Sequence, residues 1–185
     1  MSVFLLYGMI FIEVYTVKEE ELTQFATQFL RTNFHIDLII PIVRNNRLRS
    51  SYGRYVMTNK QHPVRIEVAG KTLDYGTEEA IKGIIKHECI HYALHMQGQS
   101  MRDGHPVFEK TLRKHNAPST NTMKIGLFYL FRCETCARTY ETNRKQISKT
   151  PKKYRTKCCN GKITIMETRK YDGKHFSKVS HSFTC

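Results

Sequence analysis

The sequence lacks a hydrophobic run that could cross a membrane, and it lacks a secretory signal. The apolar stretch 1–11 is too short to span a bilayer and has no basic residues of the kind that begin a signal peptide. Internal repeats and low-complexity segments are also absent. We therefore expect a cytoplasmic protein that does not enter membranes, and we interpret residues 1–11 as a first strand or as an extension before a later start at Met9.

Acidic residues are scarce. The chain has 30 Lys and Arg against 16 Asp and Glu, a formal net charge of +14 and a pI near 9.6. Such an excess favours polyanions, with nucleic acid first and anionic membrane surfaces second. Much of the charge forms one late run: Arg144, Lys145, Lys149, Lys152, Lys153, Arg155 and Lys157. The run is either a solvated loop or, as its clustering favours, a DNA contact made mainly to phosphates.

The size and the cysteines limit the organisation of the chain. At 185 residues it can hold one domain of roughly 120 residues and a small module. Six cysteines without a secretory signal indicate metal and thiol chemistry rather than disulfides. We expect Cys89 to pack on the buried face of a helix and Cys185 to be an exposed thiol without a partner.

The most informative segment is His87-Glu88-Cys89-Ile90-His91, within a stretch, residues 80–97, that predicts a helix. One helical turn separates the histidines, so both rings project from one face and can bind one zinc ion. Glu88 is offset around the helix, where its carboxylate could take a proton from a water on the metal. This pattern is typical of zinc hydrolases, most often proteases. The alternative is a core helix whose histidines are four residues apart by chance.

Three residues compete for the position of third zinc ligand. His95 lies one more turn along the same helix, where its reach to the site is poor. Asp103 could give an oxygen ligand or could act only in a turn or cap. His105 follows a turn that brings the chain back before a second helical segment, residues 107–115. We favour His105 because of this return of the chain.

Hydrophobic periodicity predicts the remaining elements. An apolar stripe predicts a helix over 17–32, and three short segments, 37–43, 53–57 and 64–68, are predicted as strands. Residues 118–121 are interpreted as a polar connector. Arg44, Arg47 and Arg49 are either a basic hairpin tip or a second phosphate contact.

The motifs also follow a recognisable order. Gly53-Arg54-Tyr55 comes first, His87-Glu88-Cys89-Ile90-His91-Tyr92 follows, and Arg102-Asp103-Gly104-His105 with Phe108 precedes a cysteine-bearing segment. Over about residues 17–165 this order resembles the SprT-like family, which includes bacterial SprT-like proteins and the eukaryotic protease Spartan.

The resemblance implies an α+β fold in which a zincin-like minimal metalloprotease domain with a small three- to four-stranded sheet precedes a zinc-ribbon-like module. We place the domain at residues 1–120 and the module at 121–165. The remaining residues, 166–185, are basic and weakly patterned, so we interpret them as a basic C-terminal tail. By position, His87, His91 and His105 would bind the catalytic zinc and Glu88 would be the general base. Arg54 or Tyr92 could assist the oxyanion. Spartan-type members digest proteins crosslinked to DNA.

Zincins bind extended substrates on an edge strand beside the active-site helix, and we assign that role to the strand 64–68. The ribbon of the family has two Cys-x-x-Cys knuckles, of which the first, Cys133 to Cys136, is intact. The second has Thr156 where the third cysteine is expected, followed by Cys158 and Cys159. Cys158 could take the missing place, although neighbouring side chains diverge on an extended backbone. The alternatives are a site completed by a histidine or water, or a ribbon held by packing alone.

The leading interpretation is a monomeric zinc endopeptidase whose protein substrates lie on or near DNA. A second is a nucleic-acid-binding module with a structural zinc and little or no turnover. A third is a regulatory partner of the transcription machinery that acts through the ribbon.

Overall fold

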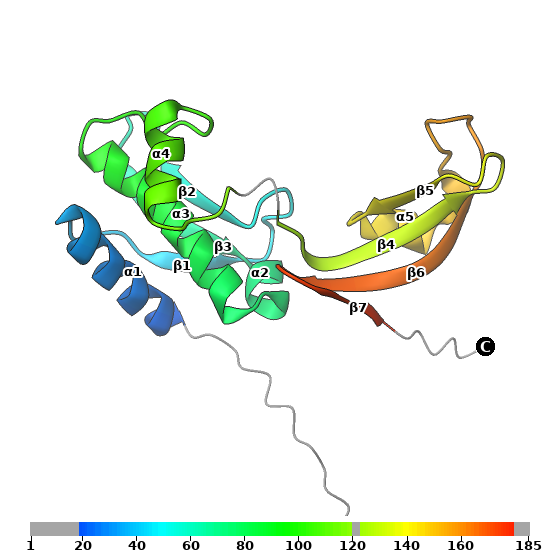
Figure 1. Cartoon of the computed structure of the whole chain (residues 1–185), viewed down its shortest axis with the longest axis horizontal. Helices are drawn as coiled ribbons and strands as arrows, with labels where there is room; N and C mark the ends of the chain where they lie inside the picture. The colour runs from blue at the N-terminus through cyan, green and yellow to red at the C-terminus, as the bar shows by residue number, and fades with distance from the viewer. Residues whose placement is uncertain (1–18, 120–122, 180–185) are drawn as a thin grey trace, which may run out of the picture.

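The computed structural model describes residues 19–119 and 123–179. Figure 1 shows two lobes, a helical one on the left and a long curved sheet on the right. The interpretations made for residues 1–11 and for Cys185 lie outside the described residues. Within the two described ranges, no helix is both long and apolar enough to cross a membrane.

The first lobe combines four helices with a three-stranded sheet, which confirms a mixed α+β fold. The helices are α1 (Glu19–Phe34), α2 (Gly70–Tyr75), α3 (Glu78–Met96) and α4 (Pro106–Lys114). The strands, in the order β1-β3-β2, are β1 (Ile42–Asn45), β3 (Pro63–Ala69) and β2 (Gly53–Met57). Strand β1 runs parallel to β3, and β2 runs antiparallel to it.

Helix α3 forms the centre of this lobe, as the apolar pattern predicts. The Thr77 hydroxyl caps its first turn by accepting the Ala80 N–H at 3.2 Å. Just beyond its last turn, Gly98 has a φ of +66°, a conformation that glycine adopts without strain. Isoleucines on several sides of α3 are fully buried, among them Ile84, Ile85 and Ile90. The helix is therefore fixed by packing around most of its circumference.

The assignment of 64–68 as an exposed edge strand is wrong. Strand β3, which contains these residues, lies in the middle of the sheet and is paired with β1 on one side and β2 on the other. Both backbone edges of β3 are occupied, so an added peptide would find no free N–H or C=O groups there. The strand predicted at 37–43 is also shorter and later, because β1 begins only at Ile42.

The second lobe is a four-stranded antiparallel sheet in the order β5-β4-β6-β7. Its strands are β4 (Ile125–Cys133), β5 (Thr139–Thr142), β6 (Ile163–Asp172) and β7 (Phe176–Val179). A short helix, α5 (Lys145–Lys149), and a 3-10 turn, η2 (Pro151–Lys153), fill the connection from β5 to β6.

Most of the segment predicted as a basic tail, 166–185, is strand in this structure. Residues 166–172 complete β6, and 176–179 form β7. Aromatic contacts stabilise this extension, because the Tyr171 ring packs on Phe128 at 5.1 Å and on Phe176 at 5.4 Å between centroids. The domain boundaries as such stay a prediction.

Direct contacts join the two lobes. The Thr77 N–H donates to the Asp172 carbonyl at 3.0 Å, and the Tyr52 hydroxyl donates to the Met123 carbonyl at 2.8 Å. Ile125, the first residue of β4, is buried against Ala80 and Ile84 of α3. The first residues of β4 are therefore part of the packing of the helical lobe.

Candidate metal centres and active site

Two histidine rings of α3 face each other across a short gap. The Nε2 atoms of His87 and His91 are 3.1 Å apart. Each ring also bonds a backbone carbonyl through Nδ1, His87 to Pro118 at 2.9 Å and His91 to Met101 at 2.7 Å. Because a carbonyl only accepts, each Nδ1 must carry the proton, which leaves Nε2 of each neutral ring as a bare lone pair. Two lone pairs at this distance repel unless a cation lies between them, so the pair fits a metal ion.

The third donor atom that the structure brings to this point belongs to Asp103. Its Oδ1 lies 3.4 Å from His87 Nε2 and 3.7 Å from His91 Nε2. These three side chains place their ligand atoms within 4.8 Å of one another. His105 is not in that group, since its Nδ1 accepts the Val107 N–H at 3.3 Å and caps α4. The role of His105 as a ligand stays a prediction.

Aromatic packing holds both rings in place. The His91 ring stacks on Phe108 with centroids 4.2 Å apart, and the His87 ring meets Phe108 edge-on at 5.2 Å. Burial and the neighbouring His87 ring lower the pKa of His91 to about 4. His91 is therefore neutral near pH 7, which is the state in which an imidazole binds a metal. His95 lies one turn further along, with Nδ1 2.7 Å from the Tyr55 hydroxyl.

Glu88 is buried beside the histidines, with 3% of its surface exposed. Its Oε2 accepts the Tyr55 N–H of strand β2 at 2.8 Å. Burial raises the pKa of Glu88 to about 8, and the charge of Asp103 adds to this shift. A cation held by the two histidines would act in the opposite direction, because positive charge favours the carboxylate.

Strand β2 approaches α3 closely at Gly53. A Cβ at this position would lie 2.8 Å from both Glu88 Oε1 and Ile84 Cγ2, so a side chain there would displace Glu88. In the sequence, Gly53 stands out only as part of a motif, and this role was not predicted. The signal was available in the glycine that begins a predicted strand, but its partner is 35 residues away in the sequence.

His87, His91 and Glu88 line a cleft of about 820 Å³. Strand β2 forms one side of the cleft, α3 contributes the two histidines and Glu88, and the loop 98–103 forms another side. Arg54 lines this cleft and donates from Nη2 to the buried Glu67 carboxylate at 2.8 Å. Tyr92 is fully buried, and its hydroxyl donates to the Asp37 carbonyl at 2.9 Å, so it points away from the cleft.

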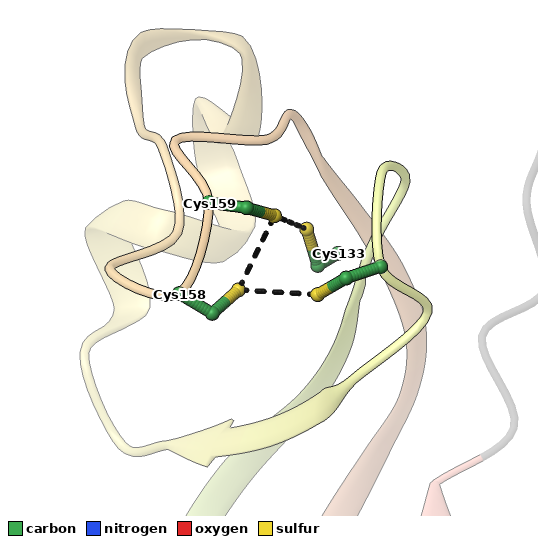
Figure 2. A group of neighbouring side chains, drawn as sticks. Cys133, Cys158 and Cys159 are labelled. Carbon is green, nitrogen blue, oxygen red and sulfur yellow. Dashed lines mark hydrogen bonds between the residues drawn. The ribbon is translucent and has the colours of Figure 1, made fainter.

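A second candidate metal site lies at the far end of the other lobe. Figure 2 shows the sulfur atoms of the cysteine cluster converging from two turns. Cys133 Sγ is 3.4 Å from Cys159 Sγ, and Cys136 Sγ is 3.3 Å from Cys158 Sγ. All four sulfurs lie within 4.8 Å of one another. A tetrahedral zinc site with Zn–S bonds of about 2.3 Å separates its sulfurs by about 3.8 Å, so the cluster fits a metal ion with four thiolates.

The altered knuckle closes because its backbone is a tight turn rather than a strand. The Asn160 N–H donates to the Thr156 carbonyl at 3.0 Å, and Asn160 itself has a φ of +54°. On such a turn, neighbouring side chains need not point to opposite sides, so the sulfurs of Cys158 and Cys159 can lie 3.6 Å apart. Gly161 completes the turn, since a Cβ there would lie 2.5 Å from Cys133 Sγ.

Thr156 contributes a hydrogen bond where a cysteine was expected. Its hydroxyl donates to Cys133 Sγ at 3.2 Å and accepts the Gly161 N–H at 3.2 Å. This hydroxyl, together with the backbone N–H groups of Cys136 and Thr135, lowers the pKa of Cys133 to about 5. A thiol with a lowered pKa is a thiolate near pH 7, the form that binds metals.

Comparison with known proteins decides the family. The model of the SprT-like family matches residues 19–125, more than half of the chain. The chain belongs to the SprT-like family. Its relatives include a protein named SprT-like from Bacillus cereus, 33% identical over 150 residues that cover 78% of this chain and 94% of the relative. The SprT-like protein of Bacillus subtilis is 36% identical over 125 residues, 64% of this chain and 78% of the relative.

A SprT-like protein of Lysinibacillus sphaericus is 30% identical over 157 residues, 80% of this chain and 98% of the relative. No solved structure matches the chain significantly. The family match ends at residue 125, so it covers the histidine centre and stops before the cysteine cluster.

Proposed function

We propose that this SprT-like protein is a zinc-dependent endopeptidase that cleaves proteins associated with, or crosslinked to, DNA. One observation carries the proposal: the lone pairs of His87 and His91 converge next to the buried carboxylate of Glu88, in a cleft open to solvent. A purely structural metal site needs neither a neighbouring general base nor an open cleft.

The donor set fits zinc well. Two neutral imidazoles with their outer nitrogens bonded to carbonyls are the usual zinc ligands, and the turn 101–105 supplies the third. A zinc ion at this point would supply Lewis-acid polarisation of a water and of the substrate carbonyl.

The protein contributes the proton transfers and the orientation of the substrate. The Tyr55 N–H holds one oxygen of Glu88 and so fixes the carboxylate beside the histidines. From there Glu88 takes a proton from the attacking water and passes it to the leaving amine. Strand β2 is the edge strand that borders the cleft, so we propose that an extended peptide pairs with β2 rather than with β3.

Metal removal tests this function. We expect the purified full chain to cleave an unfolded protein substrate, to lose this activity completely with 1,10-phenanthroline, and to regain it on addition of zinc. Cleavage is measured as the release of new amino termini. Cleavage that persists after metal analysis shows an empty protein would contradict the proposal.

Zinc retention distinguishes the two candidates for the third ligand. Imidazole suits zinc better than an exposed carboxylate, so we propose His105 and expect His105→Ala to weaken zinc binding at this centre by more than about 100-fold. The Asp103 side chain is 70% exposed, and Asp103→Ala is expected to keep the metal. Competition with a zinc-binding dye measures both variants. The reverse order of affinities would assign the third position to Asp103, the residue that the structure groups with the two histidines.

A second candidate function is a nucleic-acid-binding zinc protein with little or no proteolysis. The net charge of +14 and the cluster of four cysteines favour it, since neither is needed to cleave a peptide bond. The two candidate functions give Glu88 different roles. A peptidase needs Glu88 as a general base, whereas a binding protein does not.

A further inference from the structure

The junction of the two lobes carries a concave surface that the catalytic proposal does not use. This interlobe groove has a volume of about 660 Å³. Its cationic lining residues are Arg49, Lys71, Arg144, Lys145 and Lys149, and every other lining residue is uncharged. The chain has 16 acidic residues, yet none of them lines the groove.

Segments far apart in the sequence build the groove. Arg49 lies in the loop after β1, and Lys71 lies on α2, so both come from the helical lobe. Strand β4 of the second lobe leads away from α2, and α5 contributes Lys145 and Lys149 (Figure 1). Two basic groups that look separate in the sequence, around Arg49 and around Lys145, therefore share one concave surface.

The backbone of β4 turns against α2 at a glycine. Gly126 has a φ of +108°, in the region that favours glycine, and a Cβ on it would be in ordinary contact with Lys71 Cβ at 3.8 Å. The Lys71 ammonium is fixed next to the loop, because it donates to the Arg49 carbonyl at 2.7 Å and lies 4.5 Å from the centre of the Tyr52 ring. This wall of the groove is thus held by specific contacts.

The cations of the groove have no acidic partner among the described ranges 19–119 and 123–179, and the same holds for several cations elsewhere, such as Lys152 and Lys153. The groove differs from those places because five such cations line one concave surface. Unpaired like charges in a concave surface repel one another and focus a positive potential. A polyanion relieves that repulsion, and a single small anion would neutralise only part of it.

We propose that the interlobe groove binds a nucleic-acid strand through its phosphates. The proposal rests on the DNA-associated substrates suggested above, and it locates the nucleic acid between the lobes rather than on the exposed basic run of η2. Contacts to phosphates carry no base information, so binding is insensitive to sequence and strongly dependent on salt.

Charge-matched variants test the location. The full chain is titrated against a fluorescent DNA oligonucleotide of mixed sequence, by anisotropy, over a series of salt concentrations. We expect Lys145→Gln with Lys149→Gln to lower the affinity at least about tenfold and to reduce the salt slope by about 2. Arg49→Gln, on the opposite wall, is expected to reduce the slope by about 1. The control, Lys152→Gln with Lys153→Gln, removes the same charge from exposed positions of η2 outside the groove. It is expected to stay within about twofold of the wild type.

Two results would contradict the proposal that the interlobe groove binds nucleic acid. One is an equal loss in the η2 control, which would show that only total charge matters. The other is normal binding by Arg49→Gln, which would confine the contact to α5. Vesicles containing phosphatidylserine are tested in parallel, and loss of vesicle binding with unchanged oligonucleotide binding would assign the surface to lipid instead.

A chain with Glu88→Gln separates this proposal from the peptidase. It is expected to bind the oligonucleotide like the wild type, whatever its effect on cleavage. If the wild type has no peptidase activity, the proposal that the groove binds nucleic acid is not contradicted. If the groove variants bind DNA normally, the proposed peptidase function is not contradicted.

Discussion

Glu88→Gln is expected to lower peptide cleavage by at least about 10²–10⁴-fold, the range that a positioned general base contributes. Glutamine has nearly the same shape as glutamate, and its amide oxygen can still accept the Tyr55 N–H that now bonds Oε2 at 2.8 Å. What is lost is the ability to take up a proton. The fold and the metal content should therefore stay unchanged, and cleavage of an unfolded protein substrate measures the difference.

The control for this variant is Glu20→Gln, which removes one exposed carboxylate of α1 remote from the cleft. It is expected to leave cleavage unchanged. Equal activity of the wild type and Glu88→Gln, with the metal still bound, would assign the residue a structural role. The nucleic-acid-binding function would then be the better description of the protein.

Local patterns in the sequence were sufficient to predict the helix that carries the centre. A cap at Thr77, isoleucines at helical spacing and a glycine after the last turn all lie within about 20 residues, so short-range rules apply. The pair His87 and His91 follows from the same periodicity, since one helical turn places both rings on one face. The carbonyl partners that orient the rings, at Pro118 and Met101, come from other parts of the chain and leave no local signal.

The errors concern long-range pairing. A strand of alternating apolar residues does not show whether it will lie at an edge or in the middle, so the residues of β3 were assigned to the wrong position in the sheet. The strand structure after residue 166 was missed because its many basic residues resemble a solvated tail. The last part of β6 pairs with β4, about 40 residues earlier, and β7 pairs in turn with β6. The interlobe groove was invisible for the same reason, since Arg49 and Lys145 become neighbours only when both lobes have formed.

Loss of Cys158 is expected to empty the cysteine site. With Cys158→Ser the sulfur that now lies 3.3 Å from Cys136 Sγ is absent, and three thiolates cannot close a tetrahedral structural site. Metal analysis should fall from two ions per chain to one, matching the two groups of potential ligands. The second lobe should also become less stable to heat, because metal binding contributes directly to the folding of small modules. Two ions in the variant would show that a water or histidine completes the site.

The role of Thr156 can be separated from that of Cys158 by exchanging them. Thr156→Cys with Cys158→Thr restores the spacing of an ordinary knuckle and keeps four thiols, so we expect the second ion to return. Thr156→Ala alone keeps all four thiols but removes the hydroxyl that donates to Cys133 Sγ at 3.2 Å. Because outer-shell partners typically change metal affinity by about 10–100-fold, this variant should bind the ion more weakly without losing it, and Thr156→Ser should bind it normally. Equal affinity of the alanine and serine variants would show that the hydroxyl only fills space beside the thiolate.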